Sequence, residues 1–213
     1  MKTIHELPID ATERLKNDYG LIIDTAQKLT CDPKIVRYFE MSHKHVQRHF
    51  GTNMIDSNIS NILGNWITND LFGLLKDESG SMPNPIPNID IDAEHFGTLV
   101  WMVLDEMVSS RTAKTILDKM FHKKDVINCP MLFAKENGLQ LISNENELNI
   151  ICQNIVNNLK FSAQLSQYHK GGKNSSKAEK FFMGQVMKGT KGQAQPNILA
   201  KVLRSVLNSS SEK

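Results

Sequence analysis

Apolar residues recur at helical spacing along almost the whole chain. The most regular run follows Asp56, where one helix face collects Ile59, Ile62, Leu63, Trp66, Ile67, Leu71, Leu74 and Leu75. Asp56 is a suitable N-cap, because its carboxylate can accept the first free backbone N–H groups of a helix. The pattern therefore predicts one amphipathic helix with Trp66 in the core.

The same spacing predicts helices before and after this run. Asp32-Pro33 places an N-cap before a proline at the first helical position, and the helix that follows should end near Gly51. The prolines between Ser79 and Ile91 exclude a helix there and predict a loop. Further helices are expected after Asp92, Ser110 and Pro130. The predicted fold class is all-α.

A change in composition near residues 138–143 predicts a domain boundary. We expect a larger helical domain at 1–142, in which 1–37 forms a leading segment, and a smaller tail domain of three to four helices at 143–208. The tail helices are predicted at 144–160, 162–169, 175–188 and 196–207. Gly171-Gly172 should form a flexible turn, and 209–213 a disordered tail.

The net charge of +2 conceals two parts of opposite sign. Residues 1–142 hold 15 lysines and arginines against 19 aspartates and glutamates, a net charge of −4. Residues 143–213 hold 10 against 4, a net charge of +6. A basic tail suits a phosphate-bearing partner, although an excess of lysine can equally serve as a solvated surface.

The sequence shows no self-contained active site. The segment from Gly184 to Gly192 differs from a P-loop, because Thr190-Lys191 stand in the wrong order and a helix, not a strand, precedes them. His45 and His49 lack a third ligand, so we interpret them as surface histidines. No nucleophile motif or C-x-x-C pair appears. We predict no catalytic residue, metal site or bound cofactor in this chain, and no membrane insertion.

The densest chemical signal lies at 181–197, which reads Phe-Phe-Met-Gly-Gln-Val-Met-Lys-Gly-Thr-Lys-Gly-Gln-Ala-Gln-Pro-Asn. An apolar helix runs into a turn at 188–192 and a new helix begins at Pro196. Such a turn is expected to present backbone N–H groups and ammonium groups together, which suits a phosphate. The structural alternative is that Gly189 and Gly192 only cap helices, with lysines added for solubility.

Basic residues on both sides of the turn extend this candidate site. Lys173, Lys177 and Lys180 precede the turn, and Lys201 and Arg204 follow it. If the two helices pack antiparallel, Lys188 and Lys191 project from one tip. Phosphate contacts of this kind position a nucleic acid without reading its sequence.

The segment from Phe182 to Pro196 resembles a known family signature. It is similar to the pattern F-x-G-Q-V-M-K-x-T-K-G-x-A-x-P at the C-terminus of GatB, the B subunit of the glutamyl-tRNA(Gln) amidotransferase, and of the related YqeY proteins. Earlier residues are similar to GatB in the same order, among them Tyr19-Gly20-Leu21, Asp24-Thr25-Ala26 and Tyr38-Phe39-Glu40. The resemblance covers nearly the whole chain.

This resemblance implies a role in translation within a larger complex. In the family, glutamate misloaded on tRNA(Gln) is activated with ATP and Mg²⁺ and then amidated with ammonia that the A subunit releases from glutamine. The activation site lies in a cradle domain that we do not find in this sequence, so the chain is not expected to act alone as a carbon–nitrogen ligase. The expected partners are tRNA(Gln), the A subunit of the amidotransferase and a small third subunit.

Carried over by motif position, the resemblance assigns tRNA contacts to the turn and its flanking residues. Lys188 and Lys191 become the main candidates for phosphate contacts, and the turn glycines would let the backbone approach closely. The full expected tRNA-binding set is Lys173, Lys177, Lys180, Lys188, Gly189, Thr190, Lys191, Gly192, Lys201 and Arg204. Gln193 stands where the family often has lysine, so weaker electrostatic binding by the tip is expected.

Two other interpretations stay open. The helices could form a protein-interaction module that docks other amidotransferase subunits, or the chain could be a stand-alone YqeY-like protein, against which the residues before Tyr38 argue. The Asn-, Lys- and Ile-rich composition resembles the organellar form of the family. That resemblance implies the mitochondrial matrix, although no transit peptide is recognisable at the N-terminus.

Overall fold

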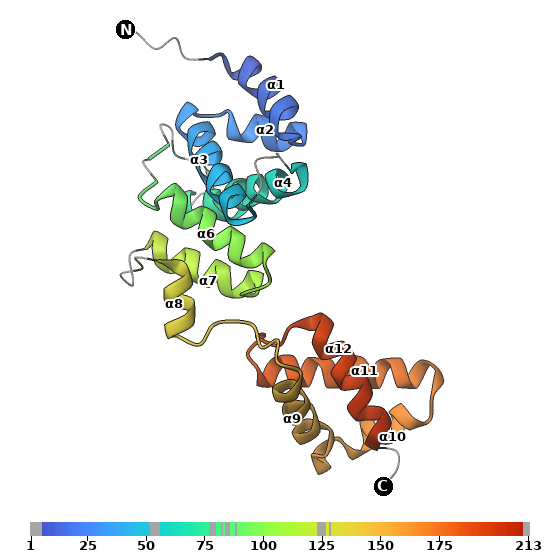
Figure 1. Cartoon of the computed structure of the whole chain (residues 1–213). Coiled ribbons are helices and arrows are strands. Elements are labelled where there is room, and N and C mark those ends of the chain that lie inside the picture. Colours follow the sequence, from blue (N-terminus) through green and yellow to red (C-terminus); the bar gives the residue numbers. More distant parts are fainter. Residues whose placement is uncertain are drawn as a thin grey trace. The chain divides into compact units, whose positions relative to one another are not determined.

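The computed structural model describes residues 6–51, 56–76, 80–81, 83, 86–87, 89–122, 127 and 129–210. Every regular element in this part of the chain is a helix, which confirms the predicted all-α fold class (Figure 1). The β-type pairing in the same residues is one parallel bridge between Ile142 and Ala194. None of these helices is long and apolar enough to cross a membrane.

The chain divides into two compact units. The first, here called the helical unit, consists of Met1–Asp105 and Thr112–Asn137, and the second, the tail unit, of Glu106–Arg111 and Gly138–Lys213. Glu106–Arg111 and residues 138–142 were expected in the first domain, but they group with the tail. Hydrogen bonds explain this grouping. Each stretch bonds to residues 193–195, and the two stretches also bond to each other.

The helical unit is built from short helices around α3. Its elements are α1 (Pro8–Tyr19), α2 (Ile23–Leu29), α3 (Pro33–His49), α4 (Ser57–Asn65), η1 (Trp66–Leu71), α5 (Phe72–Leu75), α6 (Ala93–Leu104), α7 (Ser110–Phe121, without its first two residues) and α8 (Pro130–Glu136). The helix expected after Asp56 therefore continues to Leu75, but η1 within it is a π-helix. This wider turn shifts the side-chain register in a way that apolar spacing alone did not reveal.

Three aspartates start helices of this unit as predicted. The carboxylate of Asp32 accepts the N–H of Lys34 at 2.8 Å, and those of Asp56 and Asp92 each accept an N–H two residues later at 2.7 Å. Each contact satisfies a backbone donor that has no partner inside the helix.

The core of the helical unit forms where α3 packs on α6. A Cβ atom at Gly97 would lie only 2.9 Å from the carbonyl oxygen of Ser42, so a larger residue would force the two helices apart. Phe39 on α3 and Phe96 and Leu99 on α6 are fully buried. Trp66 is also buried, as the sequence predicted.

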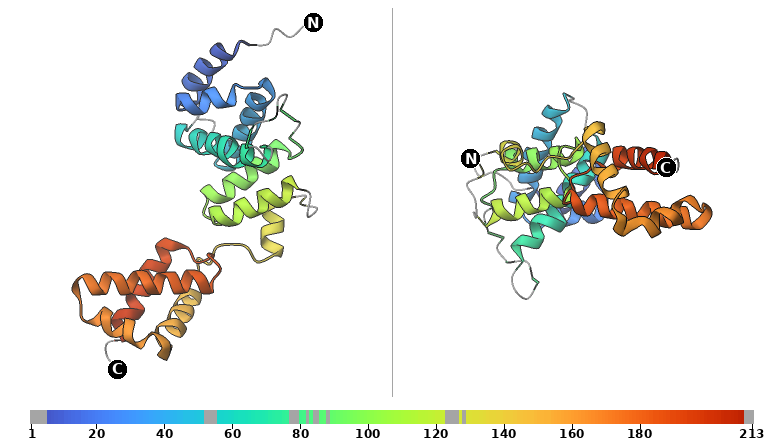
Figure 2. Two further views of the ribbon diagram at one scale, coloured as in Figure 1. Left: turned by 180° about the vertical axis from the view of Figure 1, so that it is seen from behind. Right: turned by 90° about the horizontal axis from the view of Figure 1, so that it is seen from below.

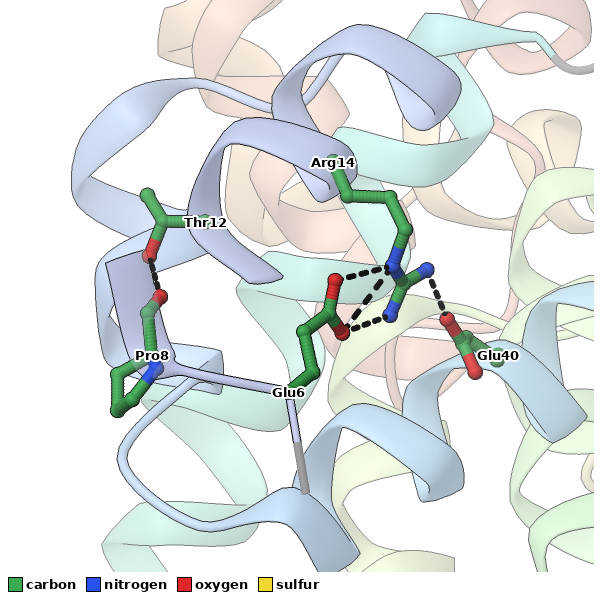
Figure 3. A network of polar contacts seen from close by, with 5 residues as sticks. All are labelled: Glu6, Pro8, Thr12, Arg14 and Glu40. Carbon is green, nitrogen blue, oxygen red and sulfur yellow. Dashed lines mark hydrogen bonds and ion pairs between the residues drawn. The ribbon is translucent and has the colours of Figure 1, made fainter. Parts of the chain in front are cut away.

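Arg14 links three segments at the edge of the helical unit (Figure 3). Its Nε lies 2.9 Å from Glu6 Oε1, before α1, and its Nη1 lies 2.6 Å from Glu40 Oε1, on α3. All three side chains are partly exposed, so the ion pairs orient α1 more than they stabilise the unit.

The tail unit consists of α9 (Glu145–Val156), η2 (Leu159–Phe161), α10 (Ser162–His169), α11 (Gly172–Gly189) and α12 (Pro196–Ser209) (Figure 2). Gly172, expected in a flexible turn, is the first residue of α11. Ser209, expected in the disordered tail, is the last residue of α12, and residues 211–213 lie outside the described part of the chain.

A single apolar core holds these tail helices together. Apart from Ala194, its fully buried members come from α9, α11 and α12, and they include Leu148, Cys152, Phe182, Val186, Leu199, Leu203 and Leu207. The parallel bridge between Ile142 and Ala194 lies just before α9 and α12 and starts both helices in the same direction. An ion pair also joins these two helices, because Lys201 Nζ on α12 lies 3.2 Å from Glu145 Oε1 on α9. Arg204 on α12 likewise reaches Glu179, ten residues before the end of α11, so α12 folds back across α11.

Candidate nucleic-acid interface

The turn between α11 and α12 is closed by backbone hydrogen bonds. The N–H of Thr190 donates to Val186 O at 2.9 Å, and that of Gly192 donates to Met187 O at 2.7 Å. Lys191 and Gly192 both have left-handed backbones, with φ of 53° and 81°. Glycine adopts this conformation freely, whereas lysine does so at an energetic cost. The backbone conformation therefore explains the glycine at position 192, whereas it does not explain the lysine at position 191.

Thr190 holds the turn from inside. Its hydroxyl is buried, donates to Val186 O at 2.9 Å and accepts the N–H of Ala194 at 3.3 Å. This single side chain thereby closes the end of α11 and orients the chain toward α12.

The backbone N–H groups of the turn are not available to a ligand. Each N–H from 190 to 195 donates to an acceptor in the tail unit, at distances between 2.7 and 3.3 Å. The expectation that this turn offers free N–H groups to a phosphate is therefore wrong. Phosphate contacts at the turn would have to come from lysine side chains.

Residues 193–195 instead hold the stretches that precede α9. The N–H of Ile142 donates to Gln193 O at 2.7 Å, and the N–H of Gln195 donates to Ile142 O at 3.1 Å. The side-chain amides also take part: Gln193 Nε2 donates to Gly138 O, and Gln195 Nε2 donates to Glu106 Oε2. Gln193 thus has a structural partner in Gly138.

Four of the predicted lysines form a stripe along α11. Lys173, Lys177, Lys180 and Lys188, here called the lysine stripe, fall within about 80° around the helix axis and span about 22 Å along it. Gly184 lies on the same side, and a Cβ atom there would meet nothing within 4 Å. This face of α11 therefore carries only positive charge and is open.

The stripe and Lys191 have unneutralised ammonium groups. All five lysines are exposed, and none forms an ion pair with any described residue. Glu179 is the one acidic residue in the α11 sequence, and it lies on another side of the helix, where it pairs with Arg204. A phosphate chain that approached this face would meet no carboxylate of α11.

Lys201 and Arg204 differ from the predicted lysines of α11 and the turn, because each forms an ion pair. Lys201 Nζ lies 3.2 Å from Glu145 Oε1, and Arg204 Nε lies 2.6 Å from Glu179 Oε1. Their charges are already partly neutralised. Of the other predicted residues, Gly189 is exposed, and a Cβ atom there would make only an ordinary 3.8 Å contact with Ile155.

His45 and His49 lie in the helical unit and form a polar pair. Their Nε2 atoms are 3.0 Å apart, and His45 Nε2 also lies 2.9 Å from Thr98 Oγ1. His49 stacks on Trp101 with ring centroids 4.0 Å apart. His45 is half-buried, so its interpretation as a surface histidine is wrong. No group of three or more potential metal-ligating His, Cys, Asp or Glu residues occurs among the residues described.

Comparison with known proteins places these features in a family. The GatB_Yqey family, described as the GatB domain, matches residues 50–207. The B subunit of the aspartyl/glutamyl-tRNA(Asn/Gln) amidotransferase of Ehrlichia chaffeensis is 29% identical over 96% of the chain and 38% of its own length. The corresponding protein of Caldicellulosiruptor bescii is 35% identical over 97% of the chain and 39% of its own length.

A mitochondrial relative gives a similar match. The mitochondrial B subunit of the glutamyl-tRNA(Gln) amidotransferase of Phytophthora infestans is 28% identical over 95% of the chain and 32% of its own length. The chain thus spans between 32% and 39% of the length of these curated relatives. The family match covers well over half of the chain and includes both α11 and the turn. The chain belongs to the GatB/YqeY family.

Proposed function

We propose that this chain is the tRNA-binding part of the GatB subunit of a glutamyl-tRNA(Gln) amidotransferase. It positions Glu-tRNA(Gln) for ATP-dependent transamidation to Gln-tRNA(Gln) during translation. The observation that carries the proposal is the lysine stripe, whose ammonium groups are exposed and unpaired among the described residues. Family membership and the names of the relatives support the identity of the partner.

The chemistry belongs to the rest of a complex in this proposal. The A subunit supplies ammonia, a small third subunit completes the assembly, and ATP and Mg²⁺ act at a site formed outside this chain. Lys191 and the stripe hold tRNA by phosphate contacts, which fix its position without reading its sequence. Relatives from Phytophthora infestans and Dictyostelium discoideum are mitochondrial, which supports action in the mitochondrial matrix.

Filter binding of the whole chain to tRNA(Gln) over a salt series tests the proposal. Four to five phosphate contacts predict that affinity falls by about a hundredfold between roughly 50 and 200 mM salt. A non-cognate tRNA should show the same slope, because the contacts are to phosphates. Absence of binding at the lowest salt, or binding that does not change with salt, would contradict the proposal.

A second candidate function is docking of other amidotransferase subunits. Four large apolar side chains on or next to α1 and α2 favour it, because Leu7, Ile9, Ile22 and Ile23 are between 55% and 69% exposed. Exposed apolar residues of this size often mark protein contacts. Capture of the amidotransferase A subunit by the wild-type chain, but not by an Ile9→Asp/Ile23→Asp variant, would support it. Equal capture by both would remove this surface from consideration.

A further inference from the structure

The tail unit contains a polar pocket away from the turn at 188–192. It has a volume of about 530 Å³ and lies between the end of α9, the start of α10 and the end of α12. Its apolar wall includes Val156, Leu165 and Val206, and its polar lining includes Gln153, Asn157 and Ser162. Every described residue that lines the pocket is uncharged, so it does not suit a phosphate or a metal ion.

Two amide side chains in the pocket are available to a ligand. Gln153 and Asn157 stand four residues apart, so they lie on the same side of α9. Both are exposed, and neither side chain has a hydrogen-bond partner among the described residues. Among the neighbouring polar groups, Asn158 Oδ1 accepts the N–H of Lys160 at 3.0 Å and Ser209 Oγ donates to Val206 O at 3.0 Å. The hydroxyl of Ser162, on α10, has no partner among the described residues. The two free amides thus lie on one wall of the pocket, at the end of α9.

This lining matches the chemistry of a nucleobase. A base is planar and uncharged, with apolar faces and with hydrogen-bond donors and acceptors along its edge. An Asn or Gln amide can form two hydrogen bonds with such an edge. Proteins that recognise RNA bases generally bind unpaired ones that are turned out of a helix. Leu159, at the rim, is 88% exposed and offers an apolar contact for a base face. The next residue, Lys160, is exposed and without an ion pair in this part of the chain, so it can meet the phosphate of the same nucleotide.

We propose that this pocket binds one unpaired base of the RNA partner, with Gln153 and Asn157 contacting its edge. The inference rests on the proposed function, because it assumes that the partner is RNA. It adds a contact that depends on an unpaired base to phosphate contacts that carry no sequence information. The stripe would supply most of the affinity, and the pocket would favour an RNA with a base free to enter.

Hairpin RNAs with and without one bulged base test this inference. Four hairpins, each with a different bulged base, are compared with the uninterrupted hairpin in binding to the whole chain. We expect at least one bulged hairpin to bind about fivefold to a hundredfold more tightly than the uninterrupted one. A Gln153→Ala/Asn157→Ala variant should lose that difference and keep the salt dependence. The control variant, Asn174→Ala/Asn197→Ala, removes two exposed amides that do not line the pocket and should retain the difference.

The outcomes separate the two proposals. If all hairpins bind the wild-type chain equally, or if the pocket variant still prefers a bulged hairpin, the inference is wrong while the proposed function stands. If no hairpin and no tRNA binds, the proposed function and the inference are both wrong.

Discussion

Arg204 Nε lies 2.6 Å from Glu179 Oε1, so this guanidinium joins α12 to α11. The Glu179 side chain is only 22% exposed, and removal of its partner would leave a poorly solvated carboxylate. Lys188 is exposed and has no ion-pair partner among the described residues, so its removal would leave no carboxylate of these residues unpaired.

The two residues should therefore respond differently to substitution. We predict that Arg204→Ala destabilises the tail unit by about 0.5–1 kcal/mol and changes tRNA affinity less than Lys188→Ala does. Lys188→Ala should lower tRNA affinity and leave stability unchanged. Amide hydrogen exchange in α11 and α12, together with filter binding, measures both effects. The opposite ranking would show that Arg204 is the stronger tRNA contact.

Thr190 is predicted to be a structural residue of the turn. Thr190→Val keeps the shape of the side chain but removes the hydroxyl that donates to Val186 O and accepts the N–H of Ala194. The tail unit should lose about 1–3 kcal/mol, because the buried N–H of Ala194 loses its acceptor, while Val186 O still accepts the N–H of Thr190. Thr190→Ser should retain most of the stability. Faster hydrogen exchange of the Ala194 amide in the valine variant, but not in the serine variant, is the expected result. Unchanged exchange in both would refute this role.

Lys191 offers a test of whether charge is kept at the expense of stability. Its φ of 53° is unfavourable for lysine by about 1–2 kcal/mol, while glycine in its place increases the entropy of the unfolded chain by about 0.5–1 kcal/mol. Lys191→Gly should thus leave the tail unit equally stable or stabilise it by up to about 1.5 kcal/mol, yet weaken tRNA binding. Chemical denaturation and filter binding give the two values. A variant that binds tRNA as well as the wild type would show that Lys191 makes no contact.

The helical unit should lose stability in mild acid. Burial lowers the pKa of His43 and of His45, and the neighbouring His49 lowers that of His45 further. In the unfolded chain both histidines have the ordinary histidine pKa of about 6.5. As the pH falls, the unfolded state therefore binds protons before the folded state does. The stability that the two neutral histidines contribute is complete above about pH 6.5 and declines below it.

Tryptophan fluorescence can follow this unit alone. The two tryptophans of the chain, Trp66 and Trp101, both belong to the helical unit. Urea unfolding monitored by fluorescence should give a free energy of unfolding that decreases between about pH 6.5 and pH 5. His43→Gln/His45→Gln should flatten that decrease, whereas His169→Gln in the tail unit should not change it. A wild-type profile without any decline would contradict the prediction.

Much of the fold was predictable because its signals are local. The Asp–Pro start of α3 and the aspartate N-caps of α4 and α6 depend on neighbouring residues and are visible in the sequence. The π-helix η1 was not predictable, because Trp66 to Leu71 continue the same apolar spacing. The grouping of Glu106–Arg111 with the tail depends on contacts such as that of Gln195 with Glu106, 89 residues apart in sequence.

The candidate site shows the same division. Lysines at positions 177, 180 and 188 lie on one face because helical periodicity puts them there, so this part of the stripe was predictable from the sequence. Lys173 was not, because the helix was expected to begin at 175 and α11 begins at Gly172. The sequence could not show that every N–H from 190 to 195 already has an acceptor. Two of these acceptors, Ile142 O and the Thr190 hydroxyl, come close only in the folded tail. The exposed glutamine and asparagine of the pocket carried no distinguishing sequence signal, since such residues are common on surfaces.

Two charge-matched variants test most directly whether the lysine stripe is the RNA-binding face. Lys173→Gln/Lys177→Gln/Lys180→Gln/Lys188→Gln removes four charges from the stripe, and glutamine preserves helix propensity. Lys16→Gln/Lys44→Gln/Lys76→Gln/Lys135→Gln removes the same number from exposed positions in the helical unit. The measurement is the slope of log affinity for tRNA(Gln) against log salt concentration. We predict that the stripe variant loses about 3 units of slope, while the control keeps the wild-type slope. Equal slopes in the two variants would contradict this account.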